Sequence, residues 1–340
     1  MISVRRFVLR RLGTALLSLI GVTIITFVLT NIVPGNPALT ALGPEVASNP
    51  GAVKAYDLRN GLNKSLPEQY ITYMGHLVQG NLGVSRVTQR PVLQDLLQYA
   101  PASIELGLVA VVLALVVGVA LGTLGAMLRD SWIDQIIRVG SLAGVSMPIF
   151  WLALVAFYLF SYKLGIFPGL GRLDPGVTPP PTVTGMYTVD ALIAGQWSTF
   201  AAAVSHILLP AFVLAAYALS LFTRFARSAV LDVVGQEFVR TARAKGLPEL
   251  VVAWRHVLRA ALVPIITIAA VMFGIMLSGT VFVESIFSWP GIGEYAFQSA
   301  TNLDLPAILG VTIFIAVIYI GLNFCVDMLY GVIDPRIRLQ

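Results

Sequence analysis

Six stretches of this chain contain no Asp, Glu, Lys or Arg and are long enough to cross a lipid bilayer as helices. A membrane-spanning helix needs about 20 apolar residues, because each residue rises about 1.5 Å and the hydrocarbon is about 30 Å thick. The sequence therefore predicts an all-α membrane protein with six transmembrane helices. Their predicted positions are residues 12–33, 106–128, 139–162, 200–222, 260–283 and 305–326, with a kink at Pro148 in the third.

The composition of the 340 residues excludes an ordinary soluble domain, a disordered chain and a coiled coil. Hydrophobic residues make up 57% and charged residues 11%, whereas soluble domains carry about 25% charged residues. Cys325 is the single cysteine, which excludes a disulfide framework and a cysteine zinc site. The basic residues lie between the apolar runs rather than together on a soluble face, so no nucleic acid is expected as a partner.

Basic residues are distributed unevenly between the two sides of the membrane that six spans define. Six spans put both termini on the same side of the membrane. If the N-terminus is cytoplasmic, 15 of the 22 Lys and Arg residues lie on the cytoplasmic side. The other 7 lie in longer outer segments, and the last outer loop, residues 288–304, has none. The positive-inside rule therefore predicts that both termini are cytoplasmic.

The outer segment between the first two spans is predicted to contain two short helices. Ser65 to Glu68 has the pattern of a capping box, with Pro67 near the first helical position, and Gly80 ends the run. The second helix is predicted to begin at Pro91. Each helix has an apolar face, formed by Tyr70, Tyr73, Met74, Leu77 and Val78 in the first and by Val92, Leu93, Leu96 and Leu97 in the second. The segment could cap the membrane domain or dock an external partner.

Two other loops differ in character. The outer stretch 161–198 contains Pro179-Pro180-Pro181 and little charge, which predicts an irregular loop near the membrane interface. The inner segment 224–259 predicts two short helices that meet at Gly246-Leu247-Pro248, because Gly stops a helix and Pro starts one. The second of these helices has Val251, Trp254, Val257 and Leu258 at apolar spacing. This basic segment could rest on lipid headgroups or insert into another protein.

Motifs for enzymatic chemistry are missing from the sequence. It has no G-x-x-x-x-G-K-[ST] phosphate loop, no H-E-x-x-H and no G-x-S-x-G, so neither a catalytic site nor a metal site is predicted. His76, His206 and His256 are far apart and lie at different membrane depths, which disfavours a shared metal site. Few carboxylates lie within the spans, which disfavours coupling to protons or sodium.

Three residues of the fifth span are candidates for a substrate pathway. Met276 and Ser278 lie in a run of small residues, 274–279, that suits close helix packing better than the lining of a pore. Glu284 is the best candidate for a charge that faces a substrate, although an interfacial carboxylate facing water is the favoured interpretation.

The inner segment carries a recognisable pattern. Residues 237–247, EFVRTARAKGL, resemble the cytoplasmic loop of permease subunits in ATP-binding-cassette importers, in the form found in the dipeptide, oligopeptide and nickel branch. The general motif has Glu-Ala-Ala, three residues, Gly, nine residues and Ile-x-Leu-Pro. Gly246 and Leu258 match its glycine and leucine. Arg240-Thr241-Ala242 and Arg259 depart from it, as is typical of the peptide branch.

Five further motifs resemble this branch and follow the family order over nearly the whole chain. They are Val33–Pro37, Gly80–Gly83, Met147–Trp151, Ile286–Gly293 and Asp334–Arg338.

The resemblance implies a type I importer permease, with a tail and first span at 1–33, an outer region at 34–103 and a core at 104–340 that contains the coupling loop 224–259. It implies one half of a peptide pathway in the cell membrane, completed by a second homologous permease subunit, two cytoplasmic ATPase subunits that bind ATP and Mg²⁺, and an external substrate-binding protein. This chain would hold no cofactor. The residues implied to contact the ATPase are Arg240, Thr241, Ala242, Arg243, Lys245, Gly246 and Leu247.

Other interpretations remain open at this stage. The same machinery could import nickel, glutathione or an oligosaccharide, because substrate choice in such systems resides largely in the binding protein. The protein could also belong to a different class, an ion-coupled secondary transporter or a channel. Such a protein would not need the basic segment around Gly246.

Overall fold

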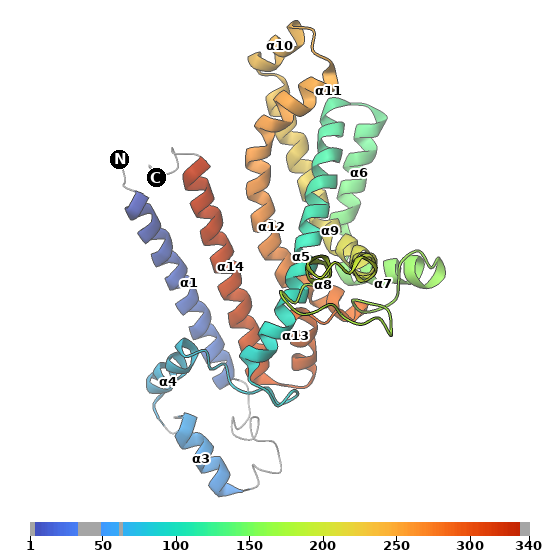
Figure 1. Ribbon diagram of the computed structural model, residues 1–340. Coiled ribbons are helices and arrows are strands. Elements are labelled where there is room, and N and C mark those ends of the chain that lie inside the picture. The colour runs from blue at the N-terminus through green and yellow to red at the C-terminus, as the bar shows by residue number, and fades with distance from the viewer. Residues whose placement is uncertain (1–3, 33–48, 61–63, 334–340) are drawn as a thin grey trace. The chain divides into compact units, whose positions relative to one another are not determined.

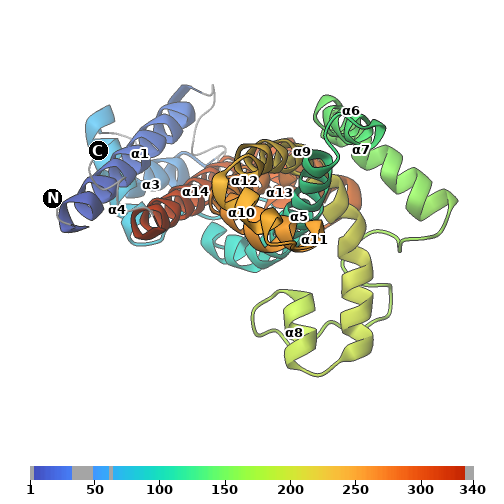
Figure 2. The ribbon, with the colours of Figure 1, turned by 90° about the horizontal axis from the view of Figure 1, so that it is seen from above.

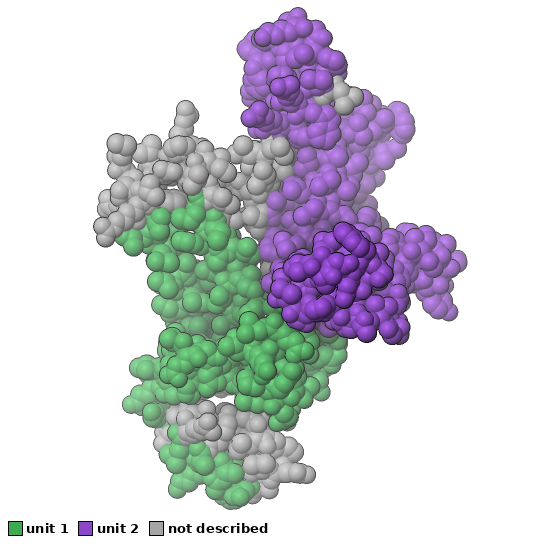
Figure 3. Space-filling view, in the orientation of Figure 1, with its two compact units in different colours: residues 1–101, 291–340 green, residues 102–290 purple. Residues whose placement is uncertain are grey.

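The computed structural model describes residues 4–32, 49–60 and 64–333, and within these ranges the chain is helical with no β-strand (Figure 1). It divides into two compact units, which Figure 3 distinguishes by colour. Unit 1 comprises residues 1–101 and 291–340, and unit 2 comprises residues 102–290. The motifs Val33–Pro37 and Asp334–Arg338 lie outside the described residues.

Unit 1 contains the first and last predicted spans. Both form long helices that pack against each other, as Figures 1 and 2 show. By length and hydropathy, residues 8–29 and 305–325 of these helices can each cross a membrane. The helices of this unit are α1 (Val4–Ile32), α3 (Pro50–Asn60), α4 (Leu66–Val78), α13 (Ile292–Thr301) and α14 (Leu305–Ile333).

Helix α4 begins where its capping box predicted. The Glu68 carboxylate accepts hydrogen bonds from the Ser65 hydroxyl at 2.9 Å and the Ser65 backbone N–H at 3.1 Å, and these bonds hold the pKa of Glu68 below its ordinary value. The single apolar face predicted for this helix is wrong at one residue. Tyr70 and Tyr73 pack on Phe27 of α1, but Val78 is 83% exposed.

The loop between α4 and α5 is attached to the start of α14 by a buried carboxylate. Asp304 is fully buried and accepts hydrogen bonds from the Ser85 hydroxyl at 2.6 Å and the Arg86 N–H at 2.8 Å. Gly83 adopts a left-handed conformation, with φ at +89°, next to Pro306. The predicted Gly80–Gly83 motif therefore lies in a turn held by these contacts.

The prediction of a separate short helix at Pro91 is wrong. Helix α5 (Val92–Met127) runs without interruption through Pro101 into the second predicted span. Its first ten residues belong to unit 1 and the rest to unit 2. Val92 and Leu96 are buried, as predicted, while Leu97 is 61% exposed. A proline removes one helical hydrogen bond but does not by itself end a long apolar helix.

Unit 2 is a group of helices in which α9 packs against α6, α7, α8 and α12. Figures 1 and 2 both show α12 beside α9. The remaining elements are α6 (Trp132–Ser146), α7 (Ile149–Ala156), the π-helix η1 (Phe157–Lys163), α8 (Tyr187–Ile193), α9 (Trp197–Val234), α10 (Glu237–Ala244), α11 (Glu249–Val251), the π-helix η2 (Val252–Leu258) and α12 (Arg259–Phe287).

The third predicted span is not one kinked helix. The chain breaks at Met147, and the helices on either side of the break are bent by 105°. Met147 has extended backbone angles, φ −86° and ψ 129°, because the residue before a proline is disfavoured in the α region. Pro148 therefore separates two helices instead of kinking one.

The number of spans depends on how this bent pair is counted. Within the described residues, four helices are long and apolar enough to cross a membrane, and the bent pair makes a fifth if it is one span. The fifth predicted span falls in α12, where several side chains lie outside the described set. The count of six stays a prediction.

The outer stretch 161–198 is more ordered than predicted, because a buried carboxylate organises it around α8. Asp190 is 1% exposed and accepts hydrogen bonds from the backbone N–H groups of Thr184 at 2.8 Å and Gly185 at 2.9 Å. Burial opposes ionisation of Asp190, but these hydrogen bonds outweigh it and hold the pKa of the carboxyl below its ordinary value.

Candidate functional site

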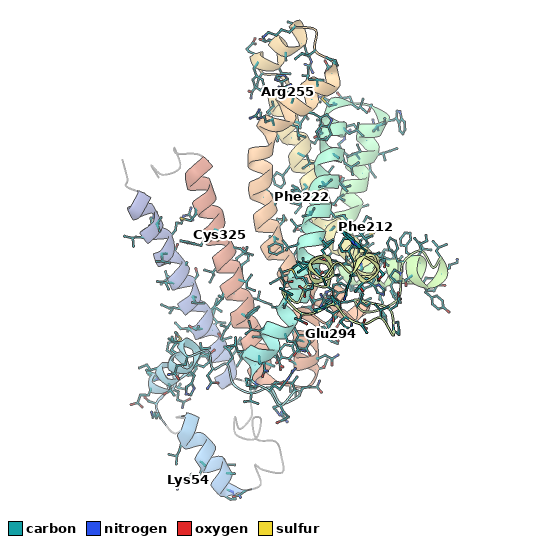
Figure 4. All side chains as sticks on the ribbon, in the orientation of Figure 1. Lys54, Phe212, Phe222, Arg255, Glu294 and Cys325 are labelled. Carbon is teal, nitrogen blue, oxygen red and sulfur yellow. The ribbon has the colours of Figure 1, made fainter. Side chains whose placement is uncertain are left out.

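The two short helices predicted around Gly246 are present. We refer to residues 237–258, which comprise α10, the turn 245–248, α11 and the π-helix η2, as the corner. The corner joins the end of α9 to the start of α12 and extends beyond both helices in Figure 1. Figure 4 labels Arg255, which belongs to it.

Gly246 sits at the turn in a left-handed conformation, with φ at +74°. The Lys245 N–H donates to Thr241 O at 3.1 Å and the Gly246 N–H donates to Arg243 O at 2.9 Å, so two of the last four carbonyls of α10 are satisfied. A Cβ atom at Gly246 would meet no atom within 4 Å. Gly246 ends the helix as predicted, and the glycine is needed for its left-handed backbone angles rather than for space within this chain.

Pro248 starts the second helical segment two residues later. Its carbonyl accepts from the N–H groups of Val251 at 2.9 Å and Val252 at 3.0 Å. Leu247, between the glycine and the proline, is 36% exposed at the outermost part of the turn. The Gly-Leu-Pro sequence thus fixes a tight reversal between α10 and α11.

The inner side of the corner is apolar, but its second half differs from the prediction. Val251 and Trp254 were expected on the packed face and are 38% and 56% exposed. The buried side chains of this half are Val252, Ala253, Val257 and Leu258. Val252 and Val257 are five residues apart, as are Ala253 and Leu258. This spacing places them on one side because the segment is a π-helix, whose hydrogen bonds run from i to i+5.

On the outer side of the corner, charged residues pair within the chain. Arg243 Nε lies 2.8 Å from Glu249 Oε1, which links α10 to α11 across the turn. Arg240 Nη1 lies 3.0 Å from Glu237 Oε1 within α10. Thr241 donates its hydroxyl hydrogen to the Glu237 carbonyl, and Ala242 faces inward. Lys245 is exposed at the end of the helix.

A buried ion pair below the corner joins α6 to α9. Asp134 is fully buried, and its two carboxylate oxygens accept hydrogen bonds from Arg227 Nε and Nη2, each at 2.8 Å. The two residues are 93 positions apart, and the sequence analysis treated Arg227 only as one of the basic inner residues. Arg227 lies two turns before the end of α9, where α10 begins.

Two glycines of α5 allow α9 to approach closely at the same level. A Cβ at Gly122 would lie 2.5 Å from the Thr223 carbonyl oxygen, and one at Gly118 would lie 2.7 Å from Cβ of Phe222, which Figure 4 labels. Any larger residue at these two positions would force the helices apart. The corner is therefore connected to a tightly packed group formed by α5, α6 and α9.

Two of the three pathway candidates have described side chains, so their common site stays a prediction. Met276 is 4% exposed, and the side chain of Ser278 lies outside the described set. Glu284 is fully buried and accepts a hydrogen bond from the Ser103 hydroxyl at 2.6 Å. The favoured interpretation of Glu284 as a carboxylate facing water is therefore wrong. Its assignment to a substrate pathway stays a prediction.

A second buried charge pair in unit 2 joins α5 to the loop that precedes α8, and no sequence signal pointed to it. Arg172 Nη2 donates to Glu105 Oε2 at 2.6 Å, and both side chains are less than 10% exposed. The Thr188 N–H and hydroxyl both donate to Glu105, and the guanidinium of Arg172 lies 3.5 Å from the centre of the Tyr187 ring. No sequence motif links these positions, so only the fold could bring them together.

The comparisons with known proteins agree with this architecture. Residues 83–339 match the family described as binding-protein-dependent transport system inner membrane component, and residues 4–107 match the N-terminal part of such membrane components. The chain belongs to this family. It is thus a permease subunit of an ATP-binding-cassette importer and a multi-pass inner-membrane protein, as the resemblance implied.

Three relatives are similar to the permease over nearly its whole length. It is 38% identical to the dipeptide transport system permease protein DppB of Alkalihalophilus pseudofirmus, covering 98% of this chain and 99% of the relative. It is 41% identical to the di/tripeptide transport system permease protein DppB of Pseudomonas aeruginosa, with the same coverage. It is 40% identical to the probable D,D-dipeptide transport system permease protein DdpB of Escherichia coli, covering 93% of each.

Proposed function

We propose that this permease forms one half of the translocation pathway for di- and oligopeptides. The other half is a second homologous permease subunit, and an external binding protein delivers the peptide. Two cytoplasmic ATPase subunits bind ATP and Mg²⁺ and supply the energy, since this chain has no phosphate-binding loop. The names of the three relatives, all peptide permeases, support the choice of substrate.

The geometry of the corner is the observation that carries the coupling role. Its apolar side is buried against the rest of unit 2, and its outer side presents Leu247 and Lys245 at a turn that Gly246 permits and the Arg243–Glu249 pair bridges. Because the turn of the corner is already formed, it loses little conformational freedom when it binds in a groove of a partner. We assign this outer side to the contact with a cytoplasmic ATPase subunit.

The corner then couples ATP binding by the ATPase subunits to a switch between two states of the permease. Closure of the ATPase dimer on ATP displaces the corner, and the displacement passes directly into α9 and α12, which flank it. The Asp134–Arg227 pair and the close contact at Gly122 carry the same displacement to α6 and α5. The pathway opens inward before closure and outward after it.

Transport by the assembled importer tests the proposal. The permease, its second subunit, the ATPases and the cognate binding protein are reconstituted in liposomes, and uptake of a labelled dipeptide is measured with and without ATP. We expect ATP-dependent uptake that requires the binding protein. Uptake of nickel, glutathione or an oligosaccharide in place of peptide would refute the substrate, and ATP-independent uptake along an ion gradient would refute the importer mechanism.

Site-directed cross-linking tests the contact separately. In a Cys325→Ser background, Lys245→Cys is expected to cross-link to an ATPase subunit in membranes that contain the complex. Lys163→Cys is the matched control, because it is an equally exposed lysine on the predicted outer side. Equal cross-linking of both positions, or none at Lys245→Cys in a complex that still transports, would refute the assignment.

A further inference from the structure

Helix α4 carries a second apolar stripe that the described residues leave exposed. Pro67, Ile71, Gly75 and Val78 follow the spacing i, i+4, i+8 and i+11, which places them on one side of a helix, and all four are exposed. Ile71 is 70% exposed and Val78 is 83% exposed.

The other two sides of α4 have different surroundings. Tyr70 and Tyr73 pack on α1, as described above. Glu68, Thr72 and His76 form a polar side at the spacing i, i+4, i+8. The helix thus has a side bound to α1, a bare apolar side and a polar side.

The contacts with α1 set the depth of α4. The Tyr70 hydroxyl lies 2.9 Å from the hydroxyl of Thr23, and the Tyr70 ring packs on Phe27 with centroids 5.4 Å apart. The apolar span in α1 runs over residues 8–29. Thr23 is six residues from its end, so it lies about 9 Å inside the apolar layer when the span is upright. A tyrosine side chain is shorter than this distance, so the backbone of α4 at Tyr70 lies within the apolar layer rather than outside it.

Exposed aliphatic side chains also lie on α1 near Phe27, on which Tyr70 packs. Ile24 and Val28 lie on either side of Phe27 in the sequence of α1, around the helix from the face that holds α4, and are 45% and 43% exposed. The stripe itself contains no charged residue. Aliphatic side chains at this depth, opposite a polar face, are typical of helices that lie in a bilayer interface.

We propose that α4 is an interfacial helix whose stripe of Pro67, Ile71, Gly75 and Val78 is covered by lipid at the headgroup–acyl boundary. Tyr70 anchors the helix to the span, and the Glu68 side faces water. The inference goes beyond the proposed function and depends on α1 spanning the membrane rather than on the transported substrate. It assigns the α4 region a position in the plane of the membrane, where it fixes the end of the first span.

Spin-label accessibility in the assembled importer tests this position. In a Cys325→Ser background, single cysteines replace Ile71, Val78 and Thr72, and Ile25→Cys on α1, a residue 62% exposed, is the lipid reference. Each labelled complex is reconstituted in vesicles of phosphatidylethanolamine and phosphatidylglycerol. Collision rates with oxygen, which concentrates in lipid, and with a water-soluble nickel chelate are measured for every label.

We expect the ratio of oxygen to nickel collisions at Ile71→Cys and Val78→Cys to approach that at Ile25→Cys and to exceed that at Thr72→Cys severalfold. Collisions with nickel as frequent as at Thr72→Cys would mean that the stripe faces water, and would overturn the proposal. Protection from both reagents would mean that a protein subunit covers the stripe, and would overturn it as well. All four substituted side chains are at least partly exposed, so the variants are expected to fold, and uptake of the labelled dipeptide reports separately on the proposed function.

Discussion

Replacement of Gly246 by leucine tests whether the corner is a mechanical link. Gly246 has φ at +74°, and a Cβ there would touch nothing within 4 Å. The cost of leucine is therefore conformational, about 1–2 kcal/mol for a side chain in the left-handed region. That cost lowers the population of the native turn relative to relaxed turns by a factor of about 5–30. The spans depend on apolar length, so membrane insertion is expected to be unchanged.

Two further substitutions separate backbone strain from side-chain size. Asn tolerates the left-handed region better than other residues, so Gly246→Asn is expected to retain most coupling although its side chain is larger than that of alanine. Gly246→Ala introduces the same backbone strain with almost no bulk and is expected to couple about as poorly as Gly246→Leu. Coupling that falls from glycine to asparagine and then to alanine and leucine alike is thus the signature of a backbone requirement.

The assay is ATPase activity stimulated by peptide-loaded binding protein, together with peptide uptake, in complexes reconstituted at equal permease content. Gly246→Leu is expected to abolish uptake and to uncouple or release the ATPase subunits. Near-normal coupled transport by Gly246→Leu would refute the coupling role of the corner. Coupling by alanine but not by asparagine would refute the backbone argument, because it would point to a close contact with the partner at this position.

Three other predictions follow from separate parts of the molecule. Reporter fusions at Gln340 and at the N-terminus should both be active in the cytoplasm, and a reporter active outside at either end would contradict the orientation. Asp134→Asn should destabilise the detergent-solubilised permease by about 3–5 kcal/mol, because it leaves Arg227 without its charged partner, and thermal unfolding that matches wild type would contradict this. The pKa of Asp190 is below its ordinary value of 3.8, so its stabilisation is present above that pH and lost as the pH falls through the lower folded-state pKa. Amide-exchange protection of residues 183–185 should therefore be unchanged between pH 7 and pH 5 and fall only below about pH 4, whereas Asp190→Asn should lower it at every pH.

Local signals in the sequence predicted the elements that depend on neighbouring residues. The capping box at Ser65 and Glu68, the helix stop at Gly246 and the restart at Pro248 are each determined within four residues, and each is present. The presence of long apolar helices was also predictable, since a run such as residues 12–33 leaves a chain in lipid few alternatives to a helix, but α1 begins at Val4, well before the run.

Errors arose where an assumed helical period or an assumed kink was too simple. The packed side of the corner was assigned with a period of 3.6 residues, and the π-helix moved burial from Val251 and Trp254 to Val252 and Ala253. The sequence does not distinguish a proline through which the helix continues, such as Pro101, from one before which the helix breaks, such as Pro148. Packing and the neighbouring backbone decide between these outcomes, and neither is visible in one sequence.

The charged pairs in unit 2 could not be predicted at all. Asp134 and Arg227 are separated by 93 residues, and Glu105 and Arg172 by 67. Each residue alone reads as an ordinary charge near the end of a span. The resemblance of residues 237–247 to importer permeases identified the function without these pairs, and the structure adds how the corner is held to the helices below it.

The charged side chains of the corner pair with one another, so ionic strength is expected to have little effect on the association of the corner with the ATPase. From Glu237 to Glu249, three basic and two acidic side chains leave a formal charge of +1, and Glu237 and Glu249 each pair with an arginine. An interface with so little net charge attracts its partner weakly over long distances, so moderate salt should change the association rate little. Discrimination between the cognate ATPase and those of other importers in the same cell would then rest on the shape of the turn around Leu247 rather than on charge.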